Sequence, residues 1–253
     1  MKVVKVVKVR RILTVVAAFL MVILWLVTNP ESYEAVFTRV ENTGASDGVY
    51  SATDGGSDDS GASAPLASEV LEKLEVKGRA PNTGYKRTDL YDDWPSVEGC
   101  SLRQKILKRE MGESAVLDGC NVVAGEFDEP YTGKHLKFTI REEISRGVQI
   151  DHVVALSDAW QKGAQGLSAE ERYALATDPL NLLAVDATVN GQKSDGDAAT
   201  WLPPNKKFRC QYVARQVSVK YRYGLWVTSA EKDAILRILS ECPNERVVGV
   251  QES

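Results

Sequence analysis

The chain has 253 residues, of which 43% are hydrophobic and 26% charged, and its formal net charge is −4. This composition excludes a wholly disordered chain and a polytopic membrane protein. The length allows one domain or two small ones. The two histidines exclude a three-histidine metal site, and the four cysteines, which form no Cys-x-x-Cys pair, disfavour a zinc finger.

Residues 1–28 combine a basic head with an apolar segment. Five cations precede Ile12, and the apolar run from Ile12 to Val27 is interrupted only by Thr14. The run is longer than a typical signal-peptide core but shorter than the roughly 20 residues of a membrane span. This pattern predicts export of everything that follows. Because no clear cleavage site follows, we favour an uncleaved signal anchor over a cleaved signal peptide. Either places the protein on the extracellular side of the cytoplasmic membrane, anchored or secreted.

Residues 29–65 are rich in Gly, Ser, Ala, Asp and Thr and show no hydrophobic period, which predicts a flexible acidic tether. Residues 29–76 hold two cations and ten acidic residues, so the net acidity belongs to this region. Residues 193–222 hold seven cations and two acidic residues. Such a basic stretch fits either a solvated helix face or a nucleic-acid contact.

The remaining chain, residues 66–253, is expected to form one domain of the α+β class. Helices are predicted near 66–74, over 101–110, after the capping box 168–171, from 187, from 205, and after the capping box 228–231. Strands are predicted over 122–125, 136–140, 148–154 and 180–185. The first two strands form a hairpin, and the last two, with the helix from 187, form a strand–strand–helix (ββα) unit. The motif core of the domain is therefore 148–197.

Export makes disulfides the expected state of Cys100, Cys120, Cys210 and Cys242. Four cysteines allow three pairings. The first two flank one predicted helix, and the last two lie on successive predicted helices. We therefore expect the sequential pairs Cys100–Cys120 and Cys210–Cys242.

Four polar residues of the ββα unit suit phosphodiester hydrolysis, which needs a base to deprotonate water and a hard cation to neutralise the phosphate. The imidazole of His152 fits the base, and the side-chain oxygens of Asp151 and Asn190 suit Mg²⁺. The fourth residue, Asn181, lies at the start of the second predicted strand. Each has a structural alternative. His152 would be a histidine whose hydrogen bonds are satisfied within the protein, and Asp151 a cap of a strand end. Asn190 would cap a helix, and Asn181 would be a turn residue.

The ordered series of motifs resembles the HNH, or His-Me finger, endonucleases. It is most similar to exported bacterial HNH-family proteins and to the C-terminal nuclease domain of GmrSD-type restriction enzymes. The resemblance extends from about Trp94 to Cys242 and is carried by the stretches 128–133 (DEPYTG), 149–160 (QIDHVVALSDAW), 178–185 (DPLNLLAV), 190–195 (NGQKSD) and 197–204 (DAATWLPP).

The resemblance implies that His152 is the general base, that Asp151 and Asn190 bind the metal, and that Asn181 orients the histidine. Lys193 is expected to contact phosphate or solvent. The sequence departs from the classical HNH pattern in two ways. A helix Asn stands in place of the final His, and the zinc-binding cysteine pairs of many HNH proteins are absent.

The implied activity is metal-dependent cleavage of nucleic acid, with Mg²⁺ (or Mn²⁺) as cofactor and with DNA favoured over RNA. The membrane is a further partner if the N-terminal segment is uncleaved, and no protein partner is evident. The rival hypotheses are a non-catalytic envelope module on a nuclease-like scaffold and a metal hydrolase of envelope polymers.

Overall fold

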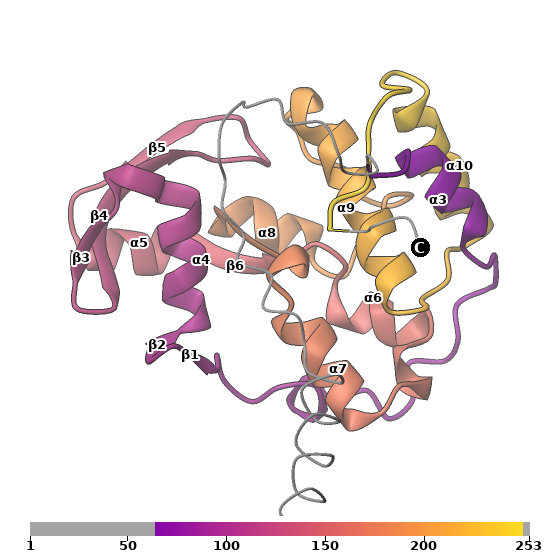
Figure 1. Cartoon of the computed structure of the whole chain (residues 1–253), viewed down its shortest axis with the longest axis horizontal. Helices are drawn as coiled ribbons and strands as arrows, with labels where there is room; N and C mark the ends of the chain where they lie inside the picture. The colour runs from indigo at the N-terminus through magenta and orange to yellow at the C-terminus, as the bar shows by residue number, and fades with distance from the viewer. Residues whose placement is uncertain (1–63, 250–253) are drawn as a thin grey trace, which may run out of the picture. The chain divides into compact units, whose positions relative to one another are not determined.

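The computed structural model describes residues 64–249 of the chain (Figure 1). The predicted signal segment and almost all of the predicted tether lie outside the described residues. Among residues 64–249, no helix is both long enough and apolar enough to cross a membrane.

Short helices and short antiparallel strands make up the described chain, which confirms the α+β class. The α-helices are α3 (Ala67–Lys73), α4 (Leu102–Met111), α5 (Arg141–Gly147), α6 (Leu156–Gln161), α7 (Ala169–Thr177), α8 (Ala187–Lys193), α9 (Arg209–Arg222) and α10 (Ser229–Leu239). The strands are β1 (Ser96–Val97), β2 (Cys100–Ser101), β3 (Val116–Asp118), β4 (Asn121–Asp128), β5 (His135–Phe138), β6 (Val148–His152) and β7 (Leu182–Asp186). They pair as three small sheets, β1–β2, β3–β4–β5 and β6–β7.

Strands β6 and β7 form the antiparallel pair on which the site is built. Val148 lies opposite Asp186, and His152 lies opposite Leu182. Every residue of β6 except Gln149 is buried, because helices cover the pair. Helix α8 follows β7 directly, and the Asp186 carboxylate caps it by accepting hydrogen bonds from two backbone amides of its first turn. The chain thus has the expected order of strand, strand and helix, with α6 and α7 inserted between the two strands.

The β4–β5 hairpin is present as predicted and packs against α4. Gly125 of β4 has a φ of +154°, and a Cβ there would lie 2.7 Å from the sulfur of Met111 on α4. Only glycine therefore allows this approach of strand and helix. The buried side chains of Ile106 and Leu107 complete the interface with the hairpin and with β7.

Helix α9 is the central element of the C-terminal half, with α3 and α10 packed on it (Figure 1). A short 3-10 turn precedes it, and the Asn205 side chain caps that turn as predicted. Gly224, with a φ of +59°, follows the end of α9. Both predicted capping boxes are present, with Ser168 starting α7 and Thr228 starting α10.

Two disulfides join the cysteines in the predicted pairing. The bond between Cys100 and Cys120 ties β2 to the β3–β4 turn. The bond between Cys210 and Cys242 ties the first turn of α9 to the segment after α10.

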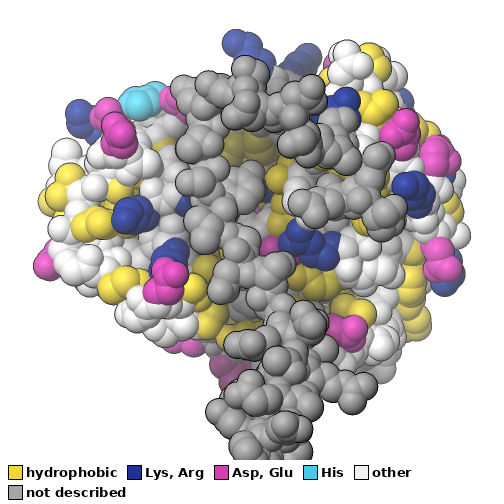
Figure 2. Space-filling view, viewed as in Figure 1, with side chains coloured by type: hydrophobic (Ala, Val, Ile, Leu, Met, Phe, Trp, Pro, Cys, Tyr) yellow, Lys and Arg dark blue, Asp and Glu magenta, His cyan; other side chains and the backbone are white. Residues whose placement is uncertain are grey.

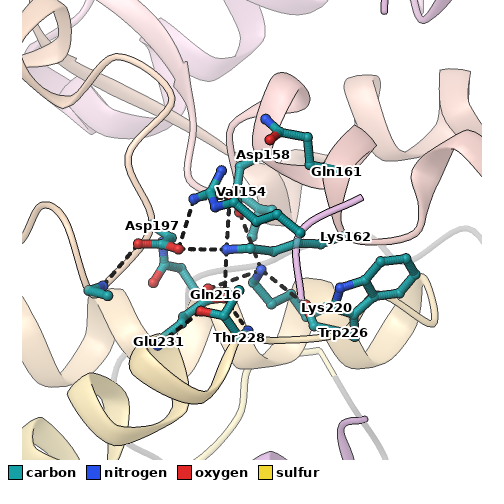
Figure 3. A network of polar contacts seen from close by, with 12 residues as sticks. Val154, Asp158, Gln161, Lys162, Asp197, Gln216, Lys220, Trp226, Thr228 and Glu231 are labelled. Carbon is teal, nitrogen blue, oxygen red and sulfur yellow. Dashed lines mark hydrogen bonds and ion pairs between the residues drawn. The ribbon is translucent and has the colours of Figure 1, made fainter. Parts of the chain in front are cut away.

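A cluster of six charged residues, five of them buried and the sixth, Arg79, partly exposed, joins α6, α9 and α10 to two loops (Figure 3). We call it the ion cluster. Its cations are Arg79, Lys162 and Lys220, and its anions are Asp158, Asp197 and Glu231. The ammonium of Lys162 is fully buried and lies 2.7 Å from an oxygen of each of the three acids. Three cations and three anions balance, which is the condition under which charges are tolerated in an interior.

Charge pairing shifts the pKa values of two residues in the ion cluster. Burial opposes ionisation of Asp197, but its bonds to Lys162 and Arg79 outweigh burial and hold the pKa of its carboxyl well below the usual range. Burial likewise opposes the charge on Lys162, but Glu231 and Asp158 raise the pKa of its ammonium. Asp197 and Lys162 are therefore both charged at neutral pH.

Replacing Asp197 with Asn should lower the free energy of unfolding by about 3–5 kcal/mol at neutral pH, because it removes one of the three anions that balance the buried Lys162 and its neighbouring cations. A depressed carboxyl pKa contributes stability above the unfolded value of about 3.9, and this stability is lost as pH falls through the folded pKa. The difference between wild type and Asp197→Asn should therefore shrink below about pH 4. Urea unfolding from pH 7 to pH 2 measures this, with Asp233→Asn on exposed α10 surface as control. An equal cost at every pH would contradict the assignment.

Candidate active site

A cavity of about 310 Å³ brings three of the predicted site residues together. Asp151 and His152 at the end of β6 and Asn190 on α8 all line it. A larger cavity of about 670 Å³, between the β4–β5 turn and α9, holds none of the predicted site residues. The smaller cavity is therefore the candidate active site. Its full lining is Tyr85, Arg87, Gln149, Ile150, Asp151, His152, Ala155, Leu156, Ser157, Asn190, Gly191, Ser194 and Asp195.

The Asp151 carboxylate is fixed from two sides. The Tyr131 hydroxyl donates to Oδ2 at 2.5 Å, and the Lys193 ammonium donates to Oδ1 at 2.9 Å. Burial raises the pKa of Asp151, while the charge of Lys193 and the hydrogen bond from Tyr131 oppose that rise. A carboxylate has about four acceptor positions in all, so the hydrogen bonds from Tyr131, Lys193 and the backbone of His152 leave one for a further ligand.

The imidazole of His152 is held in one tautomer. Its Nε2 lies 2.8 Å from the carbonyl oxygen of Ala176, an atom that only accepts, so Nε2 carries the proton and Nδ1 is left as an acceptor. The rings of Tyr91 and Trp94 pack against the imidazole at centroid distances of 5.6 and 6.0 Å. Burial is the main cause that lowers the pKa of His152 to about 3, and Arg87 and Lys193 add to it. The ring is therefore neutral at physiological pH, and its Nδ1 carries a lone pair.

Asn181 does not line the cavity but braces the backbone around His152. Its Oδ1 accepts from the amide of Val154 at 2.8 Å, and its Nδ2 donates to the carbonyls of Val154 and Leu175 at 3.3 Å. Val154 is two residues beyond His152, and Leu175 precedes the Ala176 carbonyl that holds the imidazole. This placement is consistent with the predicted role of orienting the histidine.

Asn190 and Lys193 lie on the same short helix but face different surroundings. Asn190 is partly exposed, and its Nδ2 donates to Oε1 of Gln149 at 2.8 Å. Its Oδ1 accepts no hydrogen bond from the described residues. Lys193 is buried, and its ammonium donates to Asp151 and, at 2.8 Å, to the carbonyl of His152. This geometry does not support the predicted phosphate contact of Lys193, because its charge is directed at Asp151.

The basic stretch 193–222 is largely engaged within the protein. Lys193 pairs with Asp151, Lys220 belongs to the ion cluster, and Arg222 pairs with Asp178 at 2.8 Å. The excess of cations in the sequence is therefore not a solvated basic face as a whole.

Two residues of the site were not identified from the sequence. Tyr131 lies within the motif Asp128–Gly133, but its hydroxyl meets Asp151 only through the fold. Arg87 lies ahead of the motif series and lines the cavity from a 3-10 turn, Arg87–Asp89. The motif Asp128–Gly133 could have indicated Tyr131 as a site residue, whereas no sequence pattern indicated Arg87.

Comparison with known proteins identifies the family of the chain. Residues 105–238 match the family described as GmrSD restriction endonucleases, C-terminal domain. An uncharacterized secreted protein of Arthroderma benhamiae is 36% identical over 184 residues, which cover 71% of this chain and 86% of that protein. No solved structure matches the chain. The chain belongs to the family of GmrSD restriction endonuclease C-terminal domains.

Proposed function

We propose that the protein is an exported, metal-dependent endonuclease that hydrolyses phosphodiester bonds of nucleic acid. The observation that carries this proposal is the fixed tautomer of His152, whose unprotonated Nδ1 belongs to a ring lining the same cavity as Asp151 and Asn190. A neutral imidazole beside two oxygen donors is the arrangement that water activation next to a hard cation requires.

The donor set fits a small divalent cation. Asp151 offers a carboxylate oxygen and Asn190 an amide oxygen, and both line the cavity. Oxygen ligands of this kind suit Mg²⁺ or Mn²⁺. A divalent cation held there would neutralise negative charge on the phosphoryl group and on the leaving oxygen. Tyr131 and Lys193 hold the carboxylate in place, as outer partners of metal ligands commonly do.

His152 performs the proton transfer in this mechanism. A water proton moves to Nδ1 of His152 while the water oxygen forms a bond to phosphorus. The bond from phosphorus to the leaving 3′ oxygen breaks, and this oxygen takes a proton from solvent. The Nε2 bond to Ala176 keeps the ring oriented throughout, and Asn181 braces the neighbouring carbonyl of Leu175.

Family membership and covalent structure support the proposed substrate and location. The family name refers to restriction endonucleases, which supports DNA over RNA as the substrate. The fungal relative is described as secreted, and two disulfides suit an oxidising compartment. Export through the N-terminal segment, cleaved or retained as an anchor, remains part of this proposal.

Replacing His152 with Ala should lower the rate of plasmid cleavage by about 10²–10⁴-fold, because the general base is lost. The matched control is His135→Ala, which removes the other histidine from the exposed β4–β5 hairpin. His135→Ala should cleave like wild type, and EDTA should abolish cleavage by His135→Ala and by wild type. Rates in Mg²⁺ and a thermal melt of each variant measure this. A folded His152→Ala protein that cuts at the wild-type rate would refute the assignment, and a folded wild type that never cuts would favour a non-catalytic module.

Replacing Asn190 with Ala removes a neutral ligand, so excess Mg²⁺ or Mn²⁺ should restore part of the lost rate. Asp151→Asn should be restored less, because the charge that attracts the cation is also lost. Asn244→Ala, on exposed surface, serves as the control. Cleavage rate against metal concentration distinguishes these variants. The ligand assignment fails if Asn190→Ala shows the metal dependence of wild type.

A further inference from the structure

The segment from residue 79 to 94 covers one side of the cavity, although it precedes the family-matched residues 105–238. Leu90 and Tyr91 are buried against Leu156 and Ala176. The ring of Tyr91 also packs on His152, as described above. The segment is thus anchored on the catalytic histidine.

The guanidinium of Arg87 is prepositioned by Tyr91. Its NH2 donates to the Tyr91 hydroxyl at 2.7 Å, and its central carbon lies 5.3 Å from the ring centroid. No carboxylate of the described residues forms an ion pair with it, although the side chain is exposed. A fixed guanidinium with unused donors is suited to a planar, bidentate anion such as phosphate.

Arg87 is also the one cation among the described residues that line the cavity. Lys193 is directed at Asp151 and is unavailable. Attraction of a phosphate to the cavity lining therefore depends on Arg87. In the part of Figure 2 that is not grey, basic and acidic side chains are interspersed.

We propose that Arg87 is a catalytic residue that binds the scissile phosphate and stabilises the charge of its transition state. This inference rests on the proposed function. It extends the active site to a segment N-terminal to the family-matched region. Because the guanidinium is already oriented, it needs no rearrangement as the charge develops.

The test uses two substrates that differ in what Arg87 can touch. Bis(p-nitrophenyl) phosphate has a single phosphodiester, whereas plasmid DNA adds a backbone on both sides of the cut. Arg87→Ala should lower kcat by about 10²–10³-fold on both substrates at saturating Mg²⁺ or Mn²⁺. Arg87→Lys should recover part of this loss, because it restores the charge but not the fork of donors. Lys86→Ala, which removes the exposed neighbouring cation outside the cavity lining, should match wild type.

The outcomes distinguish failure of the proposed nuclease function from failure of the proposed role of Arg87. If wild type hydrolyses neither substrate, the proposed function fails and this inference falls with it. If wild type is active and a folded Arg87→Ala protein hydrolyses bis(p-nitrophenyl) phosphate at the wild-type rate, this inference alone is overturned. A loss confined to plasmid DNA also overturns it, because Arg87 would then bind the backbone away from the scissile phosphate.

Discussion

The buried carboxylate of Asp151 is the constraint that organises the site. An ionised carboxylate without partners is very costly in an interior, so the fold must bring donors to it. Tyr131 comes from the β4–β5 turn and Lys193 from α8, while Asp151 itself ends β6. Satisfying one charge therefore fixes three segments relative to one another. Because Lys193 also binds the carbonyl of His152, the same ammonium positions the backbone of the proposed base.

Contacts beyond Asp151 also hold the site in place. Asn181 ties the backbone after His152 to the end of α7, whose Ala176 carbonyl sets the imidazole tautomer. The ion cluster then joins α6 to α9 and α10, and thereby holds the insertion between β6 and β7 against the C-terminal helices. At the cavity itself, the buried pair of Asp151 and Lys193 provides charges in fixed positions, and fixed charges and dipoles are what stabilisation of a developing charge requires.

Local patterns made much of the fold predictable from the sequence. Capping boxes, hydrophobic periods and turn residues are short-range signals, so the helices starting near 169 and 229 and the β4–β5 hairpin were foreseen. Lys193 was interpreted as a phosphate contact because a seven-residue helix does not reveal which face will be buried. The ion cluster was missed because charged residues are normally exposed, and their pairing spans distant segments. The contact of Tyr131 with Asp151 and the place of Arg87 in the cavity lining could not be predicted either, since only tertiary structure brings these residues to the site.

The central claim is that Asp151 and Asn190 together hold a divalent cation beside His152. The most direct measurement is anomalous diffraction from crystals of the protein soaked in Mn²⁺. We expect one strong peak in the cavity, within coordination distance of a carboxylate oxygen of Asp151 and the amide oxygen of Asn190. A fully occupied Mn²⁺ site elsewhere, with this cavity empty at the same concentration, would contradict the claim.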